Sequence, residues 1–101
     1  KVWRSWLIGT DAAWTDHWRS ITEASRFVAD CLFEDGAQRI EDYMLAERAG
    51  SAKWCVDGLR MQLDGILPNY ASDGRDVAVY SRTIKQIEQE AHHGRRERRA
   101  A

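Results

Sequence analysis

Residues 14–32, WTDHWRSITEASRFVADCL, carry the most regular hydrophobic pattern in this chain of 101 residues. The apolar side chains recur every three or four residues and are Trp14, Trp18, Ile21, Val28 and Leu32. Ser25 is the one polar break in the series. Such a spacing is typical of a helix with one apolar face. It predicts a long amphipathic helix, with Thr10 or Thr15 as its N-cap.

A second and a third helix are expected downstream. Asp35, with Gln38 three residues later, is a loose capping pair that opens the second helix. Its apolar positions are Ala37, Ile40, Tyr43 and Met44. Gly50 is a good stop for it, and Ser51 then caps the third helix. Gly58 lies inside the third helix, where glycine costs about 1 kcal/mol relative to alanine. We therefore expect a neighbouring helix to approach Gly58 closely.

The third helix ends at Gly65 and Pro68, because proline disfavours helical geometry in the residue before it. A last helix is predicted from Ser72 or Asp73, with these residues on one face: Val77, Tyr80, Ile84, Ile87 and Ala91. Alternating β-branched residues are nearly absent, which argues against a sheet. The sequence predicts an all-α fold, a small bundle of about four helices.

Composition narrows the class of protein. The length suits one domain over residues 1–101, and a net charge of −1 indicates neither a basic nucleic-acid coat nor an acidic disordered tail. The longest uncharged stretch, residues 65–72, is too short to span a bilayer. Cys31 and Cys55 lack zinc-site spacing, and we interpret both as buried thiols in a reducing compartment.

Both ends of the chain hold candidate partner contacts. Residues 1–9 form a tryptophan-bearing arm, either helical or extended, and residues 94–101 form a basic tail. The candidate contact residues are Trp3, Trp6, Leu7, Tyr70, Arg95, Arg96, Arg98 and Arg99. Tryptophan is typical of interface anchors, and clustered arginine binds phosphate or anionic lipid head groups. Without aromatic residues beside the tail or helix-turn-helix spacing, nucleic acid is an unlikely partner.

The sequence indicates no catalytic, cofactor or metal site. Asp16 and His17 are adjacent acid/base residues, but no nucleophile, phosphate-binding loop or HExxH spacing accompanies them. His92 and His93 are neighbours on a helix and point about 100° apart, with no third ligand in view. We therefore expect a protein that is not an enzyme and that needs no cofactor.

Three short motifs together resemble a known family. They are residues 30–35 (DCLFED), residues 59–68 (LRMQLDGILP) and a charged last helix with Tyr80, Ile84, Ile87 and Glu90. In this order they resemble the 14 kDa subunit of the mitochondrial cytochrome bc1 complex (respiratory complex III). The Leu-Pro expected after the short second helix is absent at residues 44–45, and the arginine-rich entry to the third helix is reduced.

The resemblance implies an all-helical, non-catalytic subunit on the matrix side of the inner mitochondrial membrane. Its partners would be protein subunits of a membrane complex, together with anionic lipid head groups at the basic tail. The alternative is a free-standing helical binding module in the cytoplasm. Such a module would be a phage or mobile-element inhibitor, or a nucleic-acid binder that uses the arginine-rich tail.

Overall fold

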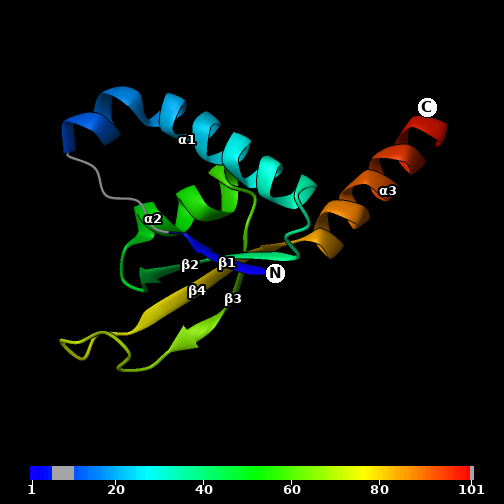
Figure 1. The fold of residues 1–101 in the computed structure, drawn as a ribbon. Coiled ribbons are helices and arrows are strands. Elements are labelled where there is room, and N and C mark those ends of the chain that lie inside the picture. The colour runs from blue at the N-terminus through cyan, green and yellow to red at the C-terminus, as the bar shows by residue number, and fades with distance from the viewer. Residues whose placement is uncertain (6–10, 101) are drawn as a thin grey trace.

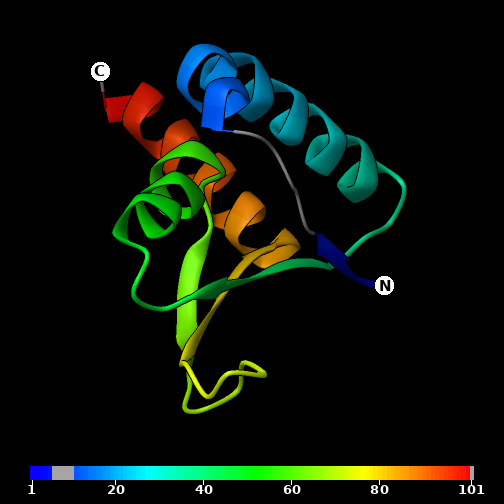
Figure 2. The ribbon, with the colours of Figure 1, turned by 90° about the vertical axis from the view of Figure 1, so that its left-hand side faces the viewer.

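The computed structural model describes residues 1–5 and 11–100, which form a four-stranded sheet with helices on one face (Figure 1). The elements in chain order are β1 (Val2–Ser5), α1 (Asp11–Glu34), β2 (Arg39–Leu45), α2 (Ala49–Lys53), the π-helix η1 (Trp54–Gly58), β3 (Gln62–Leu67), β4 (Val77–Thr83) and α3 (Ile84–Ala100). The strand order is β1-β2-β4-β3, with β1 parallel to β2 and the other pairs antiparallel. Figure 2 shows the same layers from the side.

The all-α expectation is wrong, because the structure contains this sheet. Residues of the predicted second helix form β2, in which Ile40 and Asp42 are buried and alternate with partly exposed neighbours. That period of two is typical of a strand with one covered face. The end of the predicted third helix is β3, and the start of the predicted last helix is β4.

The strand β4 lies between β2 and β3 and is buried over residues 77–81. Its β-branched Val77 and Val79 suit a pleated, densely packed environment better than a helix. Val2–Ser5, from the predicted arm, pair with β2 in the sheet, so this part is extended. Trp6 and Leu7 lie outside the described residues.

The helix α1 is present as predicted, with a kink at His17 (φ −128°, ψ 17°). After its last turn Gly36 adopts φ 97°, a left-handed conformation that favours glycine. This turn directs the chain into β2. The core lies between the sheet and the helices and consists of Phe33, Ala37, Ile40, Cys55, Met61, Ala78 and Tyr80.

The helix α3 packs only through its first turns. Ile84 and Ile87 contact the core, and the Arg82 guanidinium donates to both carboxylate oxygens of Glu90, at 3.0 and 2.8 Å. Beyond Glu90 the helix projects away from the rest of the chain (Figure 1). In the described part of the chain, no helix is long and apolar enough to cross a membrane.

Candidate binding groove

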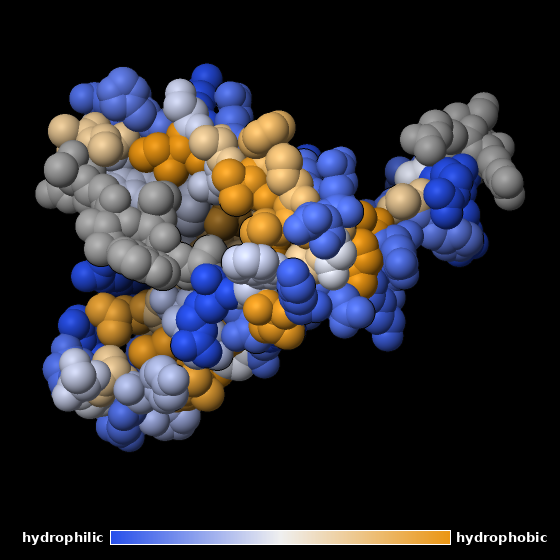
Figure 3. All heavy atoms as spheres, viewed as in Figure 1, coloured by the Kyte–Doolittle hydropathy of each residue, from blue (hydrophilic) through white to orange (hydrophobic). Residues whose placement is uncertain are grey.

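A groove runs between α1 and the α2–η1 segment and continues over the sheet toward α3. It consists of two adjoining cavities, which share the side chains of Arg26, Met44 and Trp54. The sheet basin, of about 510 Å³, lies under the C-terminal half of α1, and Ile40 and Met61 are on its wall. The helix basin, of about 850 Å³, lies between the N-terminal half of α1 and α2. Figure 3 shows hydrophobic side chains gathered along α1 and beneath it.

Trp54 joins the two sides of the groove. Its indole Nε1 donates to Thr22 Oγ1 at 2.7 Å, and that hydroxyl donates to the Trp18 carbonyl, also at 2.7 Å. The Trp14 ring meets the Trp54 ring edge-on, with 5.1 Å between centroids and 83° between planes. We call Trp14, Thr22 and Trp54 the clasp. It attaches α1 to η1 and forms the middle of the groove floor.

Arg26 adds a second bridge beside the clasp. Its Nε donates to the Gly58 carbonyl at 2.5 Å and its Nη2 to the Asp57 carbonyl at 3.5 Å. A Cβ at Gly58 would lie 3.0 Å from Trp54 Cδ1 and 3.5 Å from Thr22 Cγ2. The side chain that leaves no room for a Cβ is thus Trp54 of the same segment, η1, whereas the neighbouring helix α1 lies at ordinary van der Waals distance. The predicted reason for the glycine, a close approach by a neighbouring helix, is therefore wrong.

The groove combines an apolar floor with charged walls. Six lysine and arginine residues line it against four carboxylates. The cations are Arg19, Arg26, Arg48, Lys53, Arg60 and Arg82. The Arg26 guanidinium donates to neutral carbonyl groups, which do not compensate its positive charge. The charge of Arg82, by contrast, is compensated by the Glu90 carboxylate. Without Arg82, five cations line the groove against four carboxylates, a surplus of one positive charge in a chain whose net charge is −1.

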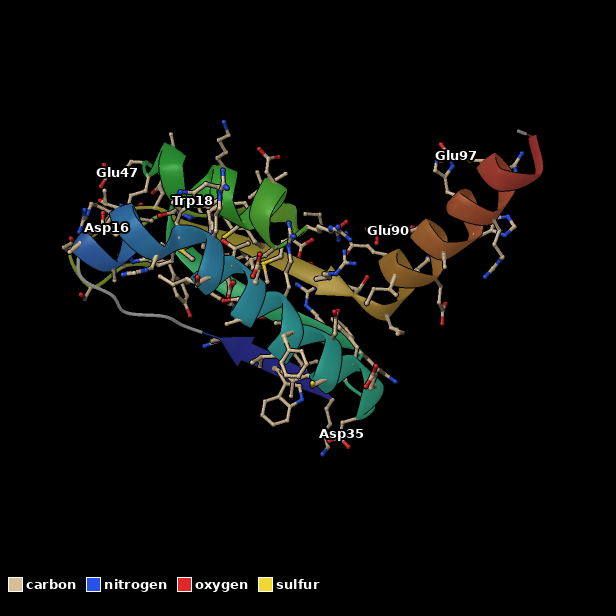
Figure 4. The ribbon with its side chains drawn as sticks, turned by 90° about the horizontal axis from the view of Figure 1, so that it is seen from above. Asp16, Trp18, Asp35, Glu47, Glu90 and Glu97 are labelled. Carbon is tan, nitrogen blue, oxygen red and sulfur yellow. The ribbon has the colours of Figure 1, made fainter. Side chains whose placement is uncertain are left out.

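Exposed hydrophobic side chains continue from the sheet basin onto α1. Val28 lines the basin and is exposed, whereas Phe27, which is 70% exposed, lines neither basin. Trp18 lies on the side of α1 that faces α2 and lines the helix basin (Figure 4). It is 49% exposed, so its interpretation as a core residue is wrong. Exposed apolar side chains that adjoin a groove are typical of a protein-binding surface.

The contact residues predicted from the sequence do not come together. Trp3 lies in β1, Tyr70 in the loop between β3 and β4, and Arg95 and Arg96 are exposed on α3. In Figure 1 that loop and the end of α3 are at opposite ends of the chain. Arg98 and Arg99 belong to α3, but their side chains lie outside the described residues.

Sequence reasoning missed the clasp partners and Arg26. Trp54 was not singled out, and its partner Thr22 lies 32 residues away in the chain.

The two cysteine thiols differ in exposure, and the adjacent acid/base residues Asp16 and His17 lie on the surface. Cys55 is fully buried, and desolvation together with the negative charge of Asp42 raises its pKa to about 12, so it stays protonated. Cys31 is exposed, so its interpretation as a buried thiol is wrong. Asp16 and His17 are exposed. Within residues 1–5 and 11–100, no group of three His, Cys, Asp or Glu side chains is placed to hold a metal ion.

The sheet face opposite the helices carries a chain of hydrogen-bonded side chains. It links Arg4, Tyr43, Glu41, Arg39, Asp64, Gln62 and Gln86. The hydrogen bond from Arg39 lowers the pKa of Glu41 against a smaller effect of burial. Burial raises the pKa of Asp64, but Ser81, Arg39 and Gln62 together lower it below its usual value. This network connects β1 to α3 through side chains of β2 and β3.

Acid is expected to destabilise the fold through this network. The pKa values of Glu41 and Asp64 are lower in the folded chain than in the unfolded chain, where they are about 4. Both carboxylates therefore stabilise the fold at pH values above about 4. That stability is lost as pH falls through the folded-state values. Urea unfolding from about pH 7 to pH 3 measures the loss. An Arg39→Met variant removes the shared partner and should flatten the profile, and an unchanged acid slope in that variant would contradict this assignment.

No protein-family model matches the chain, and no curated protein matches it. The geometry of the groove is therefore the basis for a functional proposal.

Proposed function

We propose that this chain is a non-catalytic protein-binding module whose groove receives an acidic amphipathic helix from a partner protein. The observation that carries the proposal is the pairing of an apolar floor with a surplus of cationic side chains in one groove. An amphipathic helix places apolar anchors every three or four residues in such a groove and turns its polar face toward the rim. Acidic residues on that face would meet the arginine and lysine side chains.

The length of the groove favours a helix over a small ligand. The α1 residues that line it extend from Trp14 to Leu32, about 27 Å at 1.5 Å per residue. Either basin alone has the volume of a small-molecule pocket, of about 300–1,000 Å³. The exposed Trp18 and Val28 add apolar surface at the helix basin and the sheet basin, respectively. A helix that spans both basins covers all of these features, whereas a small molecule covers one basin.

The cationic side chains at the rim of the groove predict that the partner helix is acidic. Arg48 and Lys53 flank α2 at the rim and are exposed, and the Arg19 guanidinium lies 5.2 Å from the Trp18 ring centroid. Complementary charge at a rim accelerates association and excludes partners of the wrong sign more than it adds affinity. We therefore expect discrimination between acidic and basic helices, with a strong dependence on salt.

This proposal keeps two parts of the earlier expectation, a non-catalytic role and protein partners. Membership of complex III, with its mitochondrial location, stays a prediction. The fold does not support membership of complex III, because the resemblance implies an all-helical subunit and this chain has a four-stranded sheet. Binding of nucleic acid or lipid through the tail of α3 also stays a prediction, and it is independent of the groove.

Two synthetic helical peptides test the proposal. Both carry leucine at the same helical spacing, and their polar positions are glutamate in one and lysine in the other. Trp14, Trp18 and Trp54 line the groove, so intrinsic fluorescence reports occupancy. We expect the glutamate peptide to bind at least about tenfold more tightly at low salt, with the difference shrinking as salt rises. Equal binding of the two peptides would overturn the charge argument.

Trp18→Ala locates the binding surface. Trp18 is 49% exposed and lines the helix basin, so the substitution should leave the fold intact while weakening the glutamate peptide about tenfold or more. Tyr70→Ala is the matched control, because Tyr70 is also an exposed aromatic residue (57%) but packs near Tyr43 on the opposite sheet face. Equal effects of the two substitutions would place binding elsewhere. Saturation by a small apolar acid instead of the peptide would favour the small-molecule alternative.

A further inference from the structure

The strand β3 forms one end of the sheet, and only its β4 side is paired in the described part of the chain. Its other edge presents backbone N–H and C=O groups that can pair with another strand. The opposite end of the sheet is β1, which is shorter and pairs in parallel. The β3 edge is therefore the longer of the two available for antiparallel extension.

A β-bulge places two apolar side chains of β3 on the same face. Leu63 pairs with Tyr80 and Ile66 pairs with Ala78, while Asp64 is the extra residue between the two registers. Paired residues share a face, and Ala78 and Tyr80 are two apart on β4. In a regular strand, residues three apart point to opposite faces, so Leu63 and Ile66 share a face only because of the bulge.

These side chains form an apolar rim along the open edge. Leu63 is 53% exposed and Ile66 is 45% exposed. They lie on the helix side of the sheet, where η1 packs beside β3. Edge strands in natural proteins usually carry charged side chains that discourage pairing. Here the one carboxylate of the strand, Asp64, is turned to the other face and bound by Arg39.

We propose that a second copy of this chain pairs along this edge, β3 antiparallel to β3 about a twofold axis. The register that places Leu63 opposite Ile66 of the partner subunit also places Ile66 opposite the partner's Leu63, so one contact brings the same apolar pair together twice. Cross-strand apolar pairs of this kind are the main stabilising unit of a sheet.

A second copy fits better than an unrelated strand because the edge is self-complementary. A twofold β3 pair closes on itself, whereas a β3-to-β1 contact between copies would continue as an open chain. Asp64 of each copy keeps Arg39 as its partner on the opposite face of the sheet. The symmetric contact therefore brings no unpaired carboxylate to the β3–β3 seam, the line along which the two strands pair. Residues 62–67 line neither basin of the groove, so the dimer and the binding groove are independent.

Sedimentation equilibrium of the full chain tests the dimer. We expect the average mass to rise from monomer to dimer with increasing concentration, with a dissociation constant of about micromolar order. Ile66→Lys should weaken association at least about tenfold by placing charge at the seam. Val28→Lys is the matched control, because Val28 is also exposed but lies on α1 at the groove. Far-UV circular dichroism verifies that both variants fold.

Two outcomes would overturn the proposal. One is a wild-type chain that stays monomeric up to about millimolar concentration, and the other is an equal loss of association in Ile66→Lys and Val28→Lys, which would assign self-association to the groove. Hydrogen exchange gives a second readout that needs no variant. Amides of residues 62–67 should gain protection as concentration rises, and protection confined to other segments would contradict a β3 seam.

Discussion

Replacing Trp54 by alanine is expected to lower the free energy of unfolding by about 3–4 kcal/mol. The indole packs against the core and meets the Trp14 ring edge-on. Its loss also leaves Thr22 Oγ1, in a residue that is only 6% exposed, without its donor. Since domains of this size have total stabilities of about 5–15 kcal/mol, the loss is a large fraction of the whole. The midpoint and slope of urea unfolding measure it.

Two controls separate the clasp from tryptophan burial in general. Trp18→Ala removes an indole that is 49% exposed, and it should cost under about 1 kcal/mol. Thr22→Val keeps the volume of the side chain but leaves the Trp54 N–H unsatisfied, which should cost about 1–3 kcal/mol. If Trp18→Ala proves as costly as Trp54→Ala, α1 is attached through the helix basin and not through the clasp.

The two thiols are expected to differ in reaction rate by several orders of magnitude. Cys31 is exposed and should react with a disulfide reagent as a free thiol does. Cys55 is fully buried with a pKa raised to about 12, so at pH 8 only about one molecule in ten thousand carries the thiolate that reacts. Absorbance of the released thiol should show one fast equivalent, and the second only after denaturation.

Cys31→Ser is the control for this assignment, because it should remove the fast phase and leave the slow one. Trp54→Ala should accelerate the slow phase, since opening of the clasp exposes the adjacent Cys55 more often. Two fast equivalents from the native chain would contradict the burial of Cys55. A slow phase unaffected by the clasp variant would mean that Cys55 becomes accessible only on global unfolding.

The helix α1 was predictable because its signals are local. The apolar spacing over residues 14–32 lies within the observed helix Asp11–Glu34. Helix period depends on side chains three and four positions apart, which a sequence displays directly.

The sheet was not predictable from the same patterns. Val77, Tyr80 and Ile84 lie at helical spacing, yet Val77–Thr83 form the central strand β4 and Ile84 opens α3. A short apolar run is compatible with either structure, and partners decide between them. The partners of β4 are remote in sequence, since Leu45 pairs with Val77 and Arg39 with Thr83.

The sequence by itself determined α1 and the absence of a strong global charge, because the first depends on residues close together in the chain and the second on composition. Only the tertiary structure decided the sheet, the clasp and the groove. Trp54 and Thr22 lie 32 residues apart, and the cations of the groove come from α1, α2 and the segments around β3 and β4. Strand pairing and groove geometry arise from contacts between distant segments, and these contacts leave no fixed spacing in the sequence.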